Sequence, residues 1–250
     1  MIRKLIRPCA IALAVAALNI GAITPAIAVE AAMIPAQVAA TKMLDRKDTV
    51  LLLVDHQMGL FTGVRDIQVD ELKRNVVTLA KAAQALDIPI VITNTMPDGA
   101  WGPAIPELRA ALPNAKIIVR TEINAWDNKE VAEAVRKTGR KQVLVAGVST
   151  EVCAAFPALS AKAEGFDTRV VLDASGTFND TKRTVALSRL AMAGVPITDV
   201  ATSAVELLHS NTDPKAGEVY GILNIPFATL LYQLEGAKAE QVKAELSKAK

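Results

Sequence analysis

Short apolar runs alternate with segments of helical periodicity along most of this chain. Residues 49–55 form a nearly continuous apolar run that ends in a carboxylate, and residues 89–95 and 142–147 are similar runs. Runs of this length, bounded by turn residues, are typical of strands buried on both faces of a parallel sheet. Residues 70–86 instead space their apolar side chains three or four positions apart, which predicts an amphipathic helix.

The same two patterns recur through the rest of the chain and together predict an α/β domain. Strands that alternate with helices favour a three-layer, Rossmann-like open parallel sheet with helices on both faces. The further predicted strands are residues 116–120, 168–173 and 196–199, and the further predicted helices are residues 104–112, 128–137, a segment ending near 165, 180–193 and 201–209.

Residues 1–28 have the pattern of a secretory signal peptide. A short basic segment precedes an apolar stretch at about residues 8–23 and the small-residue site Ala26-Ile-Ala28. Asn19 interrupts the apolar stretch, which is too short for a comfortable membrane span, so an uncleaved anchor is the less favoured alternative. We therefore expect a periplasmic or secreted protein that has no membrane contact after cleavage.

Removal of this segment changes the charge and the cysteine count. The segment carries three basic residues and no acid, so the net charge falls from +2 to −1. No basic footprint for nucleic acid remains. Cys9 leaves with the segment, so the mature chain keeps only Cys153 and cannot form an internal disulfide.

The remaining length suits a single domain with a substantial core. We expect a linker at residues 29–43, the domain at residues 44–210 and a tail at residues 211–250. The apolar patch at residues 222–234 predicts a helix in this tail that docks on the domain or on a neighbouring subunit.

Three chemically reactive residues, Asp55, Arg120 and Cys153, lie at the ends of predicted strands. Ligands of open parallel sheets bind beyond the carboxyl ends of the strands. There a carboxylate can accept the thiol proton while a guanidinium holds the resulting charge. Each residue also has a structural interpretation: Asp55 can cap a turn, Arg120 can be a surface charge, and Cys153 can be a small buried hydrophobe.

The sequence places Cys153 in the first turn of the helix that follows residues 142–147. Unpaired backbone N–H groups and the positive end of the helix dipole favour an anion there, and a thiolate is such an anion. We therefore expect a reactive thiol at this position. Glu151 on the same turn is expected to complement the helix dipole.

Four motifs, in order, resemble those of the isochorismatase-like cysteine hydrolases, and most closely their YcaC-like branch. The resemblance covers residues 44–235. The motifs are Leu53-Val-Asp-His-Gln57, Ile123-Asn-Ala-Trp-Asp-Asn128, Ala146-Gly-Val-Ser-Thr-Glu-Val-Cys153 with Phe156-Pro-Ala-Leu159, and Asp173-Ala-Ser-Gly-Thr-Phe178.

This resemblance implies a sheet of order 3-2-1-4-5-6 and a catalytic triad of Asp55, Arg120 and Cys153. It also implies a cis peptide between Val148 and Ser149 that aims the backbone N–H groups of Ser149 and Cys153 at an oxyanion. Most of the wider family has lysine where this chain has Arg120. Because arginine stays protonated, proton transfer must fall to Asp55.

Several further residues are candidates for substrate contact. Phe61, Trp101, Trp126 and Phe156 are candidates for the wall of an apolar pocket, although ordinary core packing is an equally good interpretation of each. Asn124 follows Arg120 closely and is a fifth candidate.

Two other polar residues have structural interpretations. Asp127 is the predicted N-cap of the helix at residues 128–137. His56 follows Asp55 and is expected to pack or to support the site rather than to catalyse.

We expect neither a metal nor a cofactor. The two histidines, His56 and His209, do not form the Asp-x-His metal cluster of the zinc-dependent nicotinamidases in the same superfamily. A glycine-rich dinucleotide fingerprint does not follow any predicted strand.

The favoured function is an exported hydrolase that cleaves an amide-like C–N bond of a small molecule through a Cys153 thioester. The alternatives are an isochorismatase-type vinyl-ether hydrolase, a non-catalytic ring-forming binding protein, and a redox sensor that cycles Cys153 through sulfenic acid. A homo-oligomer is expected because family members often form rings. The sequence does not identify the substrate.

Overall fold

The computed structural model describes residues 42–224, 234–238, 240–243 and 247. The predicted signal peptide and almost all of the predicted linker lie outside these residues, so both stay predictions. No helix in the described part of the chain is long and apolar enough to cross a membrane.

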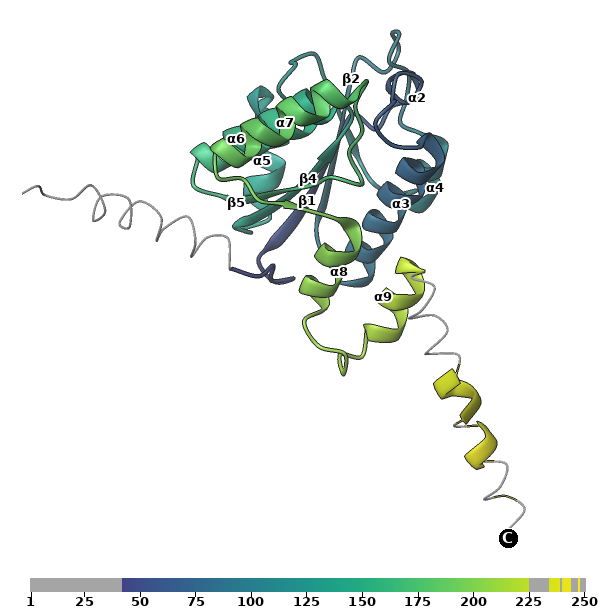
Figure 1. Cartoon of the computed structure of the whole chain (residues 1–250). Helices are drawn as coiled ribbons and strands as arrows, with labels where there is room; N and C mark the ends of the chain where they lie inside the picture. The colour runs from purple at the N-terminus through teal and green to yellow at the C-terminus, as the bar shows by residue number, and fades with distance from the viewer. Residues whose placement is uncertain (1–41, 225–233, 239, 244–246, 248–250) are drawn as a thin grey trace, which may run out of the picture. The chain divides into compact units, whose positions relative to one another are not determined.

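One open sheet, in the order β3-β2-β1-β4-β5-β6, forms the centre of the described domain (Figure 1). Every neighbouring pair of its strands is parallel. This confirms the predicted fold class and strand order. The strands are β1 (Thr49–Val54), β2 (Ile90–Thr95), β3 (Ile117–Arg120), β4 (Gln142–Gly147), β5 (Asp167–Val171) and β6 (Ile197–Thr198).

Strands β1 and β4 lie side by side at the centre and are buried along their whole length. Their register pairs Thr49 with Gln142 and Val54 with Gly147, so both strands end at the same level. The segments that follow them, which begin with Asp55 and Val148, therefore emerge together at the carboxyl edge of the sheet. This is the point where strand order reverses, and it is where ligands of such sheets bind.

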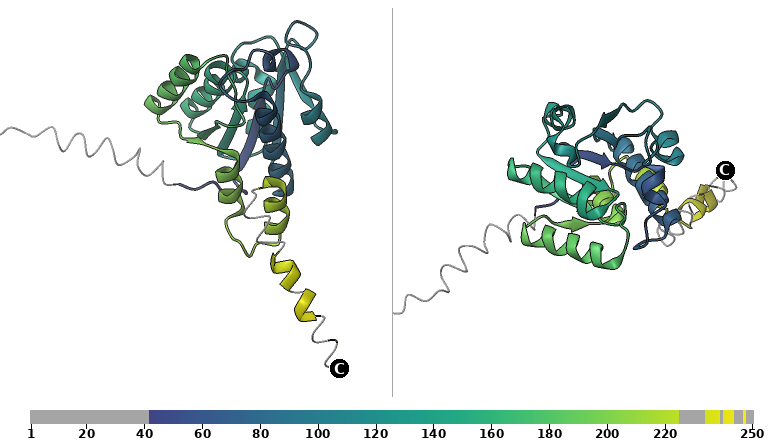
Figure 2. Two further views of the ribbon diagram at one scale, coloured as in Figure 1. Left: turned by 45° about the vertical axis from the view of Figure 1, so that its right-hand side comes forward. Right: turned by 90° about the horizontal axis from the view of Figure 1, so that it is seen from above.

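Helices cover both faces of the sheet (Figures 1 and 2). The cluster of buried apolar side chains on one face includes α2 (Met58–Phe61), α3 (Val69–Ala85), α4 (Pro106–Ala111), α8 (Val200–Leu208) and α9 (Ala216–Leu223). The cluster on the other face includes the 3₁₀ turn η1 (Ala125–Asp127), α5 (Lys129–Lys137), α6 (Ala155–Ala163) and α7 (Asp180–Met192).

Successive side chains of a strand point to opposite faces, and both faces are dry, which explains the continuous apolar runs. Leu51, Leu53 and Leu144 pack on the face of α3. Leu52 and Val145 pack on the face of α5 and α6.

The N-cap of α5 is Asn128, not the predicted Asp127. The side-chain oxygen of Asn128 accepts hydrogen bonds from the backbone N–H groups of Glu130 and Val131. Asp127 instead ends η1 and accepts a hydrogen bond from the side chain of Asn124. The extra 3₁₀ turn moves the start of α5 one residue further along the chain.

The compact fold extends past residue 210, where we predicted that the domain ends. Helix α9 lies in the predicted tail and packs against α3 and α8, with Ala216 and Val219 buried. The helix predicted from the apolar patch at residues 222–234 lies almost entirely outside the described residues.

Candidate active site

Asp55, Arg120 and Cys153 converge at the carboxyl edge of the sheet. Asp55 follows β1, Arg120 ends β3, and Cys153 lies in the π-helical turn η2 (Thr150–Ala154) that follows β4. Nη2 of Arg120 donates to Oδ2 of Asp55 across 2.5 Å, and the two side chains are 0% and 1% exposed. The Cys153 thiol interacts with the same carboxylate.

Backbone contacts fix the guanidinium of Arg120. Its Nη1 donates to the carbonyl oxygens of Glu122 and Ile123, just beyond the end of β3. The side chain thus reaches past β2 to the residue that follows β1. Nε of Arg120 is buried and has no hydrogen-bond partner among the described residues.

Asp55 has the properties of a base. Burial raises the pKa of its carboxyl above the ordinary value of 3.8, and the charge of Arg120 and the thiol of Cys153 oppose that rise only in part. Its Oδ1 is buried without a hydrogen-bond partner in the described part of the chain. One oxygen of the carboxylate is therefore held by Arg120, and the other is available for a proton.

The pKa of the thiol of Cys153, a partly buried residue, is raised. Burial raises its pKa well above the ordinary value of 9.0, the negative charge of Asp55 raises it further, and Arg120 opposes the rise. The start of the helix does not by itself lower the pKa of this thiol, and a reactive Cys153 stays a prediction. The thiol can become a nucleophile only when a nearby base takes its proton.

The turn between β4 and η2 contains the predicted cis peptide between Val148 and Ser149. Gly147 lies just before it, where a Cβ would crowd the backbone at 3.0 Å from both the Cys153 carbonyl carbon and the Val54 oxygen. The Cys153 N–H donates to the Ser149 carbonyl across 2.7 Å, so it is not free to bind an oxyanion, contrary to our expectation.

The four predicted aromatic residues do not form a single pocket wall. Phe61 and Trp126 are buried in the clusters on opposite faces of the sheet. The Trp126 indole N–H donates to Glu164, and its ring packs edge-on against Phe166 at 5.5 Å between centroids. Ordinary core packing is thus the correct interpretation for Phe61 and Trp126. Trp101 is 44% exposed in the loop before α4.

Phe156 and Asn124, in contrast, line the same cavity of about 540 Å³, although Asp55, Arg120 and Cys153 are not among the residues that line it. Phe156 lies three residues after Cys153, and the opposite wall is the segment whose carbonyls hold Arg120. Asn124 donates to Ser160 of α6 and so joins the two walls. The guanidinium of Arg189 covers the Phe156 ring at 5.0 Å. The lining combines the apolar side chains of Ile123, Phe156 and Leu159 with polar and charged groups, and the volume lies in the range of small-molecule sites.

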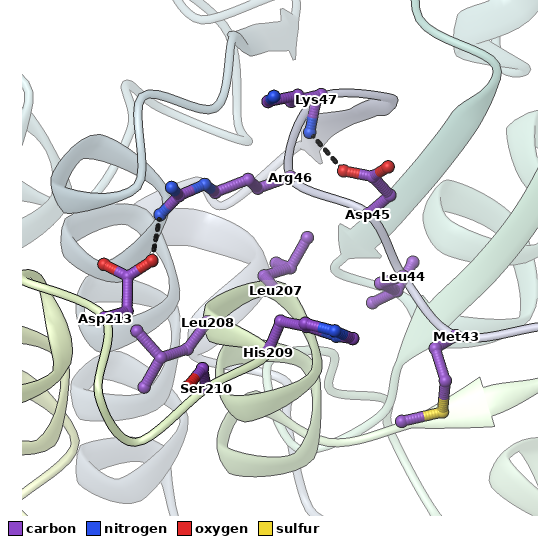
Figure 3. A pocket seen from close by; sticks show the side chains of 10 residues that line it. All are labelled: Met43, Leu44, Asp45, Arg46, Lys47, Leu207, Leu208, His209, Ser210 and Asp213. Carbon is purple, nitrogen blue, oxygen red and sulfur yellow. Dashed lines mark hydrogen bonds and ion pairs between the residues drawn. The ribbon is translucent and has the colours of Figure 1, made fainter.

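A second cavity, of about 400 Å³, lies at the other end of the sheet (Figure 3). Residues 43–47, which precede β1, form one wall, and residues 207–210, at the end of α8, form another. The ion pair between Arg46 and Asp213, 2.9 Å long, closes one side. This cavity therefore lies at the amino ends of the strands, away from the triad.

His56 and Gln57 support the site from the motif that begins at Leu53. His56 is buried, its Nε2 bonds to the Ala174 carbonyl across 2.9 Å, and burial lowers its pKa to about 4. These contacts fit the predicted supporting role. Gln57, which we did not single out, donates to the carbonyls of Thr95 and Gly102 and accepts from the Thr95 N–H. The sequence signal that could have identified Gln57 is its position directly after Asp55 and His56, the two residues that follow β1.

Among the residues that the structure describes, no three His, Cys, Asp or Glu side chains gather into an arrangement that could hold a metal ion.

Comparison with known proteins places this geometry in a family. The model of the isochorismatase domain family matches residues 49–202. A protein from Escherichia coli strain K12, named probable hydrolase YcaC, is 50% identical over 155 residues, which is 62% of this chain and 74% of that protein.

Two solved structures of YcaC proteins resemble the fold closely. The crystal structure of YcaC from Escherichia coli, described as an octameric hydrolase of unknown specificity, has a TM-score of 0.73 and 43% identity, and covers 78% of this chain and 97% of that one. YcaC from Pseudomonas aeruginosa, solved with hexane-2,5-diol and covalent acrylamide, has the same TM-score and identity, over 78% and 98% of the two chains.

Proposed function

This chain belongs to the isochorismatase family and is a hydrolase, and we propose that it cleaves an amide-like C–N bond of a small molecule through a thioester on Cys153. One observation carries this proposal. The Asp55 carboxylate is paired with Arg120 through one oxygen, interacts with the Cys153 thiol, and has its other oxygen unpartnered among the described residues.

In the first half of the proposed reaction, Asp55 takes the proton of the Cys153 thiol while the sulfur attacks the carbonyl carbon of the substrate. The raised pKa of Asp55 makes it a stronger base than an ordinary aspartate. The new carbon–sulfur bond gives a tetrahedral oxyanion. When the oxyanion collapses, the C–N bond breaks, and Asp55 gives its proton to the leaving nitrogen, which departs as an amine.

In the second half, Asp55 removes a proton from water as the water oxygen attacks the thioester carbon. The carbon–sulfur bond then breaks, the acid product leaves, and the proton on Asp55 returns to the sulfur. One water molecule is consumed, and the enzyme regains its starting protonation state.

Arg120 takes no part in proton transfer, because a guanidinium stays protonated in proteins. Its role in the proposal is to hold Asp55 ionised and in place, with Nη1 fixed by backbone carbonyls and Nη2 on the carboxylate. The proposed oxyanion donor is the N–H of Ser149 in the cis turn, since the Cys153 N–H is engaged.

We propose that the non-reacting part of the substrate occupies the cavity lined by Asn124 and Phe156. Its apolar side chains include Ile123, which is 73% exposed, and the partly buried Leu159. The Pseudomonas aeruginosa YcaC structure contains covalent acrylamide, which a nucleophile acquires by addition to the carbon–carbon double bond; it supports a reactive nucleophile in that relative and does not bear on the bond that is cleaved.

Export and self-association are also part of the proposal. Export rests on the signal-peptide pattern of residues 1–28. Assembly into a homo-oligomer is supported by the octameric state of the Escherichia coli relative.

The redox alternative is less favoured, because sulfenic acid formation depends on thiolate character and the Cys153 thiol has a raised pKa. The vinyl-ether alternative differs from our proposal in that its chemistry does not require a nucleophile.

The proposal is tested by offering small amides, nitriles and carbamates to the native protein and to Cys153→Ala, with mass detection of products and of adducts on Cys153. We expect turnover by the native protein only. Full turnover by Cys153→Ala would overturn the thioester mechanism and favour a route without a nucleophile.

A further inference from the structure

The loop between β5 and α7 contains a segment, residues 174–177, that contacts the turn carrying the nucleophile. We call residues 174–177 the brace and residues 147–153, which end at Cys153, the nucleophile turn. Both follow neighbouring strands, because β4 and β5 pair in register from Gln142 and Asp167 onwards. They therefore meet at the same edge of the sheet as the triad.

Three consecutive brace residues each bind the nucleophile turn. Oγ of Ser175 accepts a hydrogen bond from the Gly147 N–H at 3.1 Å. The carbonyl of Gly176 accepts one from the Thr150 N–H at 3.0 Å. These contacts fix the backbone on both sides of the cis peptide.

The third contact joins two side chains. Oγ1 of Thr177 donates to Oε2 of Glu151 across 2.5 Å, and Glu151 lies two residues before Cys153. The Glu151 side chain is only 15% exposed, and its other oxygen lies 3.8 Å from Nζ of Lys182. Glu151 therefore does more than complement a helix dipole, which was its predicted role.

The brace also contacts the segment directly after β1, which carries Asp55, the proposed base. The carbonyl of Ala174 is bonded to Nε2 of His56, the residue directly after Asp55. One short segment thus touches both the neighbour of the base and the turn of the nucleophile.

Buried hydrogen bonds and close packing join the brace to the rest of the domain. The Thr177 N–H donates to Oδ1 of Asp66 across 2.6 Å, and the Thr177 carbonyl accepts from the Arg65 N–H. The Asp66 side chain is fully buried and pairs with Arg183. A Cβ on Gly176 would lie 2.6 Å from Cδ2 of Leu72, so the brace is pressed against the core.

We infer that the brace sets the position of the Cys153 thiol relative to Asp55, and that Thr177 and Glu151 are positioning residues for the proposed reaction. The inference rests on the proposed role of Cys153 as nucleophile and Asp55 as base. The contact between Thr177 and Glu151 joins a side chain of the brace to a side chain of the turn, so it can be changed from either side without altering the backbone.

The test compares Thr177→Val, which keeps the side-chain shape but loses the hydroxyl, with Thr177→Ser, which keeps the hydroxyl. The readout is the rate at which iodoacetamide alkylates Cys153 in the full-length protein between pH 5 and 10, followed by peptide mapping to separate Cys153 from Cys9. We expect Thr177→Val to slow alkylation at neutral pH by about tenfold, as for loss of a hydrogen bond to a charged group. Thr177→Ser should stay close to the native rate.

Two further variants separate positioning from folding. Glu151→Gln keeps an acceptor for Thr177 and should retain most of the native rate, whereas Glu151→Ala should match Thr177→Val. The double variant Thr177→Val with Glu151→Ala should be no slower than either single variant, as expected for two residues that act through one contact.

An unchanged or faster rate in Thr177→Val, with only a lower melting temperature, would overturn the inference, because a merely structural residue lowers stability without changing the pH profile. Asp55→Asn distinguishes this failure from failure of the proposed function. If Asp55→Asn alkylates at the native rate and pH dependence, Asp55 is not the base and the proposed chemistry fails, whatever the Thr177 variants do.

Discussion

Arg120 and Asp55 form an ion pair whose two side chains are excluded from solvent, with Nη2 and Oδ2 separated by 2.5 Å. The pair joins two strands that are not neighbours, because Arg120 ends β3, Asp55 follows β1, and β2 lies between them. The geometry leaves the second carboxylate oxygen for chemistry. Because both charges are buried, removal of either one would leave the other without a partner and without water.

Removal of the Arg120 charge should therefore be costly. Arg120→Met leaves the Asp55 carboxylate buried without its cation, and we expect a loss of roughly 3–5 kcal/mol in the free energy of unfolding. Urea denaturation measures it. The matched control is Lys116→Met, because Lys116 pairs with Glu130 at the surface, and such pairs contribute little. Equal effects of the two substitutions would contradict the buried pair.

The reactivity of Cys153 should depend on pH through Asp55. The carboxylate accepts the thiol proton only when ionised, and its pKa is raised, so alkylation should fall as the pH decreases through a value above 3.8. Because the thiol pKa lies well above 9.0, the native protein should show no plateau of full thiolate reactivity below pH 8.

Asp55→Asn is the informative variant for this pH dependence. Without the base, alkylation at neutral pH should drop. Because the charge of Asp55 also raises the thiol pKa, the rise at high pH should begin at a lower pH in Asp55→Asn than in the native protein. Iodoacetamide kinetics from pH 4 to 10 measure both profiles. A native protein that is fully reactive at pH 6 would show that burial does not hold the thiol protonated.

Burial of neutral His56 should make stability depend on pH. Its pKa is about 4 in the folded protein and 6.5 in a model peptide, so the unfolded chain binds more protons between these values. The contribution of neutral His56 to the free energy of unfolding is therefore full above about pH 6.5, and it decreases as the pH falls towards 4. Between pH 7 and pH 5 we expect a loss of roughly 2 kcal/mol.

His56→Gln is the control for this residue, because glutamine does not titrate and its amide can still donate towards the Ala174 carbonyl. Urea denaturation at pH 7 and pH 5 should give a smaller difference for the variant than for the native protein. Identical differences would mean that His56 is not buried in the neutral form.

The helix cap of α5 offers a separate test of the structure. Asn128→Ala removes the acceptor of two backbone N–H groups and should lower the free energy of unfolding by about 1 kcal/mol. Asp127→Ala, one residue earlier, should have a much smaller effect, because Asp127 accepts only from a side chain. The reverse ranking in thermal or urea denaturation would restore Asp127 as the cap.

The strands, their order and the grouping of the triad could be predicted because they depend on local patterns and on motifs at strand ends. Residues 50–54 and 143–147 are apolar throughout, as expected for parallel strands covered on both faces. The ends of parallel strands meet at one edge, so the positions of Asp55 and Cys153 just past two such strands were enough to place them together.

What could not be predicted depends on contacts between distant segments. The indole N–H of Trp126 donates to Glu164, 38 residues later in the chain, and its ring packs against Phe166, 40 residues later. These contacts direct the side chain to the core. The high pKa of Cys153 arises from burial, which no local pattern reveals. The brace depends on Asp66, which lies 111 residues before Thr177.

In the proposed reaction, Cys153 carries the acyl group of the substrate during turnover. The most direct measurement is mass spectrometry of the native protein, quenched in acid while it hydrolyses a small amide, with peptide mapping of the modified residue. We expect an acyl group on Cys153 that disappears when the substrate is exhausted and is absent from Cys153→Ala. Steady turnover with Cys153 unmodified, together with full activity of Cys153→Ala, would contradict it.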